Sequence, residues 1–191
     1  MTFTVAFVTG ATPDKWARTW RERTPERLEL LPVEEAEQLD GLHAGTASMA
    51  LVRLPIDRAG LHCIPLYDEQ QVAVVSREHY LSLAEDVSLE ELAEEQLVLP
   101  HPSGWTPRVE QRRWPPMGAK DAIEVAASGG GIVIVPASVA RLFHRKDVVA
   151  RPVLDLPPTK VGLAWRIDDE DPRVQTFVGI VRGRTARSSR S

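Results

Sequence analysis

The first stretch of the chain has the pattern of a buried strand that ends in a small-residue turn and opens a helix. Residues 3–8 are almost all apolar, which is typical of a strand covered on both faces in a parallel sheet. Gly10 permits a tight bend, Thr12 can cap a helix, and Pro13 suits the first helical position because it has no N–H to leave unpaired. We therefore expect a helix over 13–23, with the free amides of its first turn beside the loop.

The same alternation of apolar runs and polar breaks continues along the chain. Within the first 55 residues it predicts a β-α-β-α-β order, which implies right-handed crossovers and a parallel sheet. Short apolar runs predict further strands over 28–33, 49–52, 61–65, 71–76, 97–99, 132–135, 148–153 and 160–165. Helical spacing and capping signals predict helices over 34–44, 88–95, 119–128, 138–144, 171–181 and, in a segment that fits no pattern well, 108–113.

Two stretches have the pattern of crossings between two lobes. Residues 66–71 are polar and too extended for a helix, and the pair Pro157-Pro158 stiffens a second crossing. On both sides of these crossings the predicted order is strand, polar loop and helix. Two α/β lobes joined by two passes of chain form a cleft, in which a small ligand would bind.

The loops at the carboxyl ends of the strands are the candidate ligand site, because ligands bind there in open α/β sheets. Thr9 and Thr12 place hydroxyls beside a helix N-terminus, which suits an anion, unless both residues only cap and turn. Arg53, at the end of the third strand, suits a carboxylate effector or else a salt bridge between the lobes. His101, in the loop 100–104, can donate to a ligand or titrate, or it can be an ordinary hydrogen-bonding residue.

Composition narrows the class of protein. The 191 residues are 43% hydrophobic, which is enough for one core or for two small ones. No run approaches the ~20 apolar residues of a membrane span, and the first residues lack the pattern of a signal peptide. The single cysteine, Cys63, excludes an internal disulfide and favours a reducing cytoplasm.

Charge is distributed unevenly along the chain. The net charge is −4, but four arginines put +4 into the last ten residues, so the remainder carries −8. A body this acidic is a poor surface for nucleic acid. The tail over 183–191 is small, polar and basic, and we expect it to be mobile, either as a solvated end or as an arm that touches DNA.

The sequence gives no support for catalysis. His62 and Cys63 are neighbours, so on a strand they face opposite sides and cannot act as base and nucleophile. The five histidines lack metal-ligand spacing, and neither a Gly-x-Ser-x-Gly nor a phosphate-loop motif occurs. The glycines 129–131 follow a helix and precede a strand, which is the wrong order for a dinucleotide loop. We expect no enzyme, no metal and no cofactor.

Four stretches, in this order, carry a resemblance to a known family. They are a helix-end glycine with its following strand (42–51), a strand with a preceding Glu and a following His element (66–81), a short helix and strand (88–99), and a glycine-rich helix end before a buried strand (126–136). Together they resemble the effector-binding domain of LysR-type transcriptional regulators. The resemblance implies the type 2 periplasmic-binding-protein fold, an α/β fold of two Rossmann-like lobes joined by two crossover strands.

The resemblance also implies an organisation. Lobe I is expected over 1–70 with 156–191, lobe II over 71–155, and the effector cleft between them. Family members pair side by side in antiparallel fashion, which implies a homodimer through 13–23 of one subunit and 138–144 of the other. Together with Thr12, the family's ligand loops match Thr9, Gly10, Ala11, Arg53, Leu54, His101, Pro102, Ser103, Gly130, Gly131 and Ile132.

Two departures from the family pattern affect the expected function. Family regulators begin with a winged helix-turn-helix, whereas this chain begins on the sensing domain's first strand, so we expect DNA contact only through a missing domain or a separate partner. Ser48 and Tyr80 stand where the family usually has Asp and Pro. The expected function is cytoplasmic sensing of a small effector, with a carboxylate favoured and no membrane partner. The alternatives are a stand-alone cytoplasmic solute-binding protein and, less favoured, an enzyme of the same fold.

Overall fold

The chain divides into two compact units. The computed structural model describes residues 2–183, so the predicted basic tail, apart from Gly183, lies outside the described residues. Unit 1 comprises the chain up to Tyr67 and from Lys160 onward, and unit 2 comprises Asp68–Thr159. The sequence predicts lobe boundaries after residues 70 and 155, whereas the boundaries between the two units fall after residues 67 and 159.

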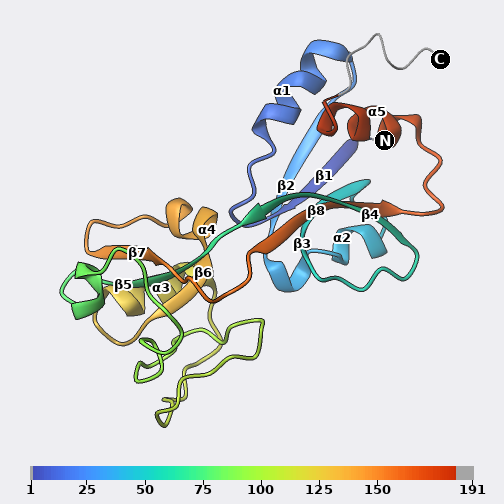
Figure 1. Cartoon of the computed structure of the whole chain (residues 1–191). Coiled ribbons are helices and arrows are strands. Elements are labelled where there is room, and N and C mark those ends of the chain that lie inside the picture. Colours follow the sequence, from blue (N-terminus) through green and yellow to red (C-terminus); the bar gives the residue numbers. More distant parts are fainter. Residues whose placement is uncertain (1, 184–191) are drawn as a thin grey trace. The chain divides into compact units, whose positions relative to one another are not determined.

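A five-stranded sheet forms the centre of unit 1 (Figure 1). Its strands are β1 (Phe3–Val8), β2 (Leu28–Val33), β3 (Met49–Leu54), β4 (Leu61–Glu69) and β8 (Thr159–Arg166), in the order β2-β1-β3-β8-β4. β1 is parallel to β2 and to β3, as the β-α-β-α-β pattern predicts, whereas β8 is antiparallel to β3. The helices of this unit are α1 (Asp14–Arg23), the 3-10 turn η1 (Glu35–Glu37), α2 (Asp40–His43) and α5 (Pro172–Val181).

The neighbouring strands β1 and β3 of unit 1 are buried on both faces because helices cover both. On one face Phe3 stacks on Trp20 of α1, with ring centroids 4.9 Å apart, and both rings contact Phe177 of α5. On the other face Ala6 and Leu42 belong to a second buried cluster with β3, β8 and α2. This arrangement confirms the prediction of a doubly covered first strand.

Unit 2 is built on a three-stranded antiparallel sheet (Figure 1). The central strand β5 (Gln71–Ser76) pairs with β6 (Val133–Pro136) and with β7 (Val148–Pro152). α3 (Ala119–Ala127) and α4 (Ala137–Leu142) pack on one face of β5 through Val72 and Val74. The other face packs against the 3-10 turn η2 (Tyr80–Leu83) and the loops that follow it.

The helix predicted over 34–44 is wrong, and Gln38 supplies the physical reason. η1 and the short α2 replace that helix, and Gln38 lies between them. The Gln38 side chain bonds to the backbone of β3, because Arg53 N donates to its Oε1 at 2.7 Å and its Nε2 donates to Arg53 O at 3.1 Å. This amide pairs with the backbone N–H and C=O of β3 as a neighbouring strand would. It thereby holds the segment between η1 and α2 against the sheet.

Two capping predictions have different outcomes. Thr12 does not cap α1, because Pro13 occupies the cap position and no side chain bonds there. At the last helix the prediction is confirmed, since the Asp171 carboxylate accepts a hydrogen bond from Arg173 N at 2.9 Å. Pro13 therefore lies just before the helix rather than in its first turn.

The segment 84–118 contains none of the three elements predicted in it. The capping-box bonds between Ser88 and Glu91 are formed, but turns follow instead of a helix over 88–95. The strand over 97–99 is reduced to one parallel bridge between Leu97 and Ile132, and residues 108–113 form no helix. Here side chains satisfy the backbone in place of regular structure, as shown by Leu97 N donating to Gln111 Oε1 at 2.7 Å.

Candidate functional site

The first candidate loop lies at the carboxyl edge of the sheet in unit 1. Because β1 and β3 are parallel neighbours, Thr9, which follows β1, and Arg53, near the end of β3, lie at the same edge of the sheet. The Thr9 hydroxyl can donate to Val33 O or to Glu34 Oε1, each at 3.2 Å. Gly10 takes φ +93°, so the bend after β1 needs a glycine. The hydroxyl thus joins the ends of β1 and β2.

Arg53 is the buried cation of this edge. Its side chain is only 3% exposed, and its Nη1 lies 3.4 Å from Oε2 of Glu35, whose side chain is 44% exposed. The Gln38 amide fixes the backbone of Arg53 by bonding to its N–H and to its carbonyl oxygen. A buried guanidinium paired with a half-exposed carboxylate can exchange that carboxylate for one from a ligand.

The other predicted residues of unit 1 differ in accessibility. Ala11 is buried, and its N–H bonds to Val8 O at 3.0 Å, so it helps to close the turn. Thr12 is exposed next to this turn. Leu54 is half-buried and packs against the cluster that contains Leu42. Unit 1 therefore brings Thr9, Gly10, Ala11 and Thr12 together in one turn, with Arg53 and Leu54 at the end of the adjacent strand.

In unit 2 the loop at His101 holds a neutral imidazole in one tautomer. The Nδ1 atom accepts a hydrogen bond from Ser103 N at 3.2 Å and lies 2.7 Å from Ser103 Oγ. Because Nδ1 accepts, the proton resides on Nε2. Burial lowers the pKa of His101 below its usual value, which favours this neutral form. Nε2 is buried and has no hydrogen-bond partner among residues 2–183.

The geometry of this loop leaves His101 Nε2 as a hydrogen-bond donor without an acceptor among the described residues. Pro102 and Ser103 are exposed, and the Ser103 hydroxyl oxygen accepts from Trp105 N at 3.2 Å. Ser103 is therefore occupied in shaping the turn and in orienting the ring. A buried N–H without an acceptor is costly, which makes Nε2 the polar atom of this loop most in need of a partner.

The third predicted loop, Gly130–Ile132, is close-packed. Ile132 is fully buried, and its backbone bonds to Gln96 O and Val98 N. A side chain on Gly131 would come within 2.3 Å of Gln96 O, and one on Gly130 within 2.8 Å of Val125 Cγ1. The glycines thus permit close approach of backbones.

Gly130 and Gly131 precede β6, as the sequence predicted, and lie next to the parallel bridge between Leu97 and Ile132. They belong to the candidate site only through the family resemblance, whereas His101 was also indicated by its place after the predicted strand over 97–99.

Gln71 is a polar residue that the sequence analysis missed. It begins β5, is 5% exposed, and pairs in register with Pro136 of β6. Its Nε2 donates to Thr159 Oγ1, while its Oε1 is buried without a hydrogen-bond partner in the described part of the chain. The signal that could have identified it is a glutamine at the head of an otherwise apolar strand.

Cys63 and His62 are neighbours on β4. Burial raises the pKa of the Cys63 thiol, which makes it a poor nucleophile, and the His62 ring lies against Trp165, with centroids 5.4 Å apart. Within residues 2–183 no group of three His, Cys, Asp or Glu side chains could hold a metal ion. None of the described helices has the length and apolarity needed to cross a bilayer.

Comparison with curated proteins identifies transcriptional regulators. The chain is 23% identical over 189 residues to the HTH-type transcriptional regulator AlsR of Bacillus subtilis, covering 91% of this chain and 62% of AlsR. It is 28% identical over 181 residues to the regulator CatR of Pseudomonas putida, covering 86% of this chain and 61% of CatR. The chain thus spans about three fifths of these relatives, which are regulators and not enzymes.

Comparison with solved structures supports the fold. The effector-binding domain of BenM, solved with its effector benzoate, matches with a TM-score of 0.77 at 21% identity, covering 95% of this chain and 90% of that domain. The reduced OxyR regulatory domain from Pseudomonas aeruginosa matches with a TM-score of 0.75 at 18% identity, covering 95% of this chain and 96% of that domain. The predicted two-lobed α/β fold is therefore confirmed.

The family itself is identified by the match of a whole-domain profile. The family described as the LysR substrate binding domain matches residues 4–186. The match begins in β1 and extends beyond α5, so it includes both units. The chain therefore belongs to the LysR substrate-binding domain family, the effector-binding domain of LysR-type transcriptional regulators.

Proposed function

We propose that this domain senses a small carboxylate, with Arg53 and Thr9 as its ligand residues in unit 1. The observation that carries the proposal is the nearly complete burial of Arg53 at a carboxyl strand edge, where its Nη1 lies 3.4 Å from Oε2 of the half-exposed Glu35. A guanidinium in this setting favours a planar carboxylate, which can accept two parallel hydrogen bonds. The BenM domain, whose fold is similar, was solved with benzoate, which is itself a carboxylate.

In unit 2 the ligand residue that we propose is His101, as a neutral donor. Its Nε2–H can donate to a hydrogen-bond acceptor of the effector. The lowered pKa keeps the ring neutral, so this donor adds directionality rather than charge. The effector class that fits is a small acid with a hydrogen-bond acceptor and a modest apolar body.

We further propose that effector binding changes the geometry of a homodimer, which α1 of one subunit and α4 of the other would form. Such a change would alter how a helix-turn-helix domain, in the same chain or on a partner, meets DNA. The relatives are transcriptional regulators, so the proposed compartment is the cytoplasm. Light scattering would test the dimer, with Arg18→Glu on the exposed part of α1 expected to weaken it.

A thermal-shift screen of small carboxylates, with benzoate as the first probe, tests the proposed site. A bound effector raises the melting temperature by mass action. Arg53→Ala and Thr9→Val should abolish or reduce that shift, whereas Arg58→Ala, which removes an exposed arginine from the same unit, should leave it unchanged. An equal shift in the wild type and in Arg53→Ala would place the ligand elsewhere.

A further inference from the structure

Unit 2 contains a hollow whose charged and titratable lining residues are all basic. It has a volume of about 370 Å³, within the range of small-ligand pockets. It lies beside the end of β5, the end of α4 and the edge strand β7. Arg77, His144 and Arg151 line it together with Val74, Ala140 and residues 148–150. The chain has 27 aspartate and glutamate residues and 23 lysine and arginine residues. Even so, none of the described aspartates and glutamates lines this hollow.

Arg77 is fixed in place without being neutralised. Its backbone N–H donates to Asp147 O at 2.9 Å, and its Nε donates to Lys146 O at 2.9 Å. Both partners are neutral carbonyls, so the positive charge stays uncompensated. Among the described residues Arg77 forms no ion pair, and its two terminal nitrogens stay available.

Arg151 is held in a similar way on β7. Its Nη2 donates to Ser82 O and its Nη1 to Ala150 O, at 3.4 Å for the latter. Its Nε is buried and has no hydrogen-bond partner within residues 2–183. Two guanidinium groups therefore border one hollow with only carbonyl partners, so an anion that enters it would be attracted by both charges.

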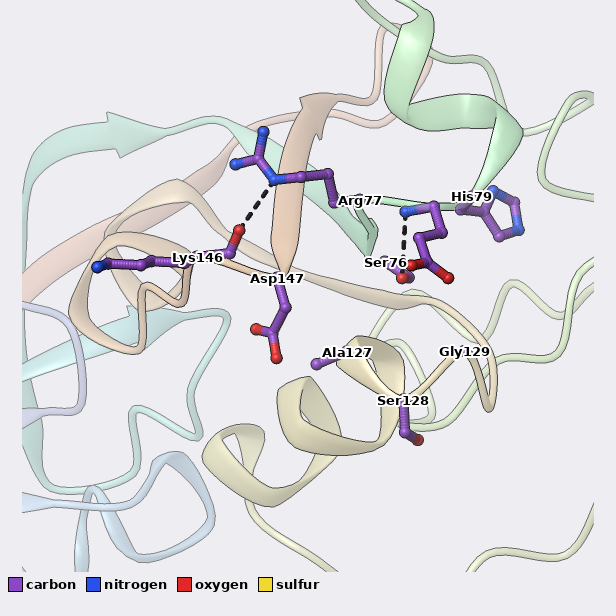
Figure 2. A pocket seen from close by; sticks show the side chains of 9 residues that line it. Ser76, Arg77, His79, Ala127, Ser128, Gly129, Lys146 and Asp147 are labelled. Atoms are coloured by element: carbon purple, nitrogen blue, oxygen red, sulfur yellow. Dashed lines mark hydrogen bonds between the residues drawn. The ribbon is translucent and has the colours of Figure 1, made fainter.

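Asp147, whose backbone carbonyl accepts from Arg77, does not compensate these charges with its carboxylate. A second hollow, of about 540 Å³, shares Arg77 and is lined by residues 76–79, 127–129, Lys146 and Asp147 (Figure 2). The Asp147 carboxylate pairs with Arg145 at 2.8 Å, and this bond lowers the pKa of Asp147. Figure 2 shows that this carboxylate and the Arg77 guanidinium point in opposite directions. Asp147 is thus committed to Arg145.

We propose that the hollow lined by Arg77, His144 and Arg151 is a second binding site, specific for a small oxyanion such as a phosphate or a carboxylate. The guanidinium groups supply forked donors, and His144 adds a further nitrogen. The apolar residues Val74 and Ala140 limit the size of the ligand. The site lies wholly within unit 2, so it is separate from Arg53 and Thr9.

Titration of the whole protein with inorganic phosphate and with malonate tests this site. The reference titration uses sodium chloride at the same ionic strength, so that the effect of general screening can be subtracted. Two-dimensional NMR should show saturable shifts confined to amides near residues 74–77 and 140–151. Arg77→Gln and Arg151→Gln should each weaken binding by about ten-fold or more, since each removes a charge-assisted donor.

Arg145→Gln is the matched control. It removes an arginine from the same segment, but Arg145 pairs with Asp147 and does not line the hollow. Its affinity for either anion should stay within about two-fold of the wild type. Equal weakening by all three variants would mean a diffuse charge effect and would overturn the site, as would shifts no larger than those in sodium chloride. Arg53→Ala should bind these anions normally, which separates this result from the effector test.

Discussion

The two units satisfy their polar groups in different ways. In unit 1 a doubly covered sheet brings Thr9 and Arg53 to one edge, where the acidic residues Glu34 and Glu35 meet them. In unit 2 a smaller antiparallel sheet is extended by the segment 84–118, which long-range side-chain amides hold in place. The first arrangement depends on strand order and the second on individual contacts, so the two units should respond differently to substitution.

The largest expected effect is in the core of unit 1. Trp20 is fully buried, stacks on Phe3, and donates from Nε1 to Glu26 O at 2.8 Å. Trp20→Ala should lower the free energy of unfolding by about 3–5 kcal/mol, because it leaves a large cavity. Urea unfolding measures this loss, and Leu83→Ala, at a site 90% exposed, is the neutral control. A loss below about 1 kcal/mol would contradict the assigned core.

A smaller effect is expected in the irregular part of unit 2. Gln111 accepts from Leu97 N and donates to Glu95 O and Val109 O. Gln111→Ala should cost about 1–3 kcal/mol, because it leaves a backbone N–H without an acceptor. Hydrogen exchange should show the loss of protection first at Leu97. Protection at Trp20 should not change, and equal loss in both places would argue against independent local stability.

This contrast also explains how much the sequence could predict. The strands and most helices follow from apolar alternation, which is why the order around Phe3 and Val72 was predicted correctly. The segment 84–118 was not, because Gln96 and Gln111 satisfy backbone groups far away in the sequence. The same limit applies to the site. Strand ends indicated Thr9 and Arg53, but the bonds between the Gln38 side chain and the backbone of Arg53 could not be predicted from the sequence.

Glu35 offers a sharper test of the edge in unit 1. If it competes with an effector for Arg53, then Glu35→Gln should tighten binding of a carboxylate such as benzoate by about three- to ten-fold. Calorimetry measures this change directly. Glu37→Gln, which removes a carboxylate from the same 3-10 turn, is the charge-matched control. Weaker binding in Glu35→Gln would show that Glu35 supports the ligand rather than competing with it.

The smallest expected effect is a pH dependence from His101 in unit 2. Burial lowers its pKa in the folded protein, so between the folded and unfolded pKa values the unfolded chain binds more protons. The stabilising contribution is therefore complete above the usual histidine pKa, near 6.5, and is lost as the pH falls below it. His101→Gln should flatten this part of the stability profile while keeping a side-chain donor. Urea midpoints between about pH 5 and 8 measure the difference. If the wild type and His101→Gln lose stability in parallel, the neutral Nε2–H assigned to this loop is wrong.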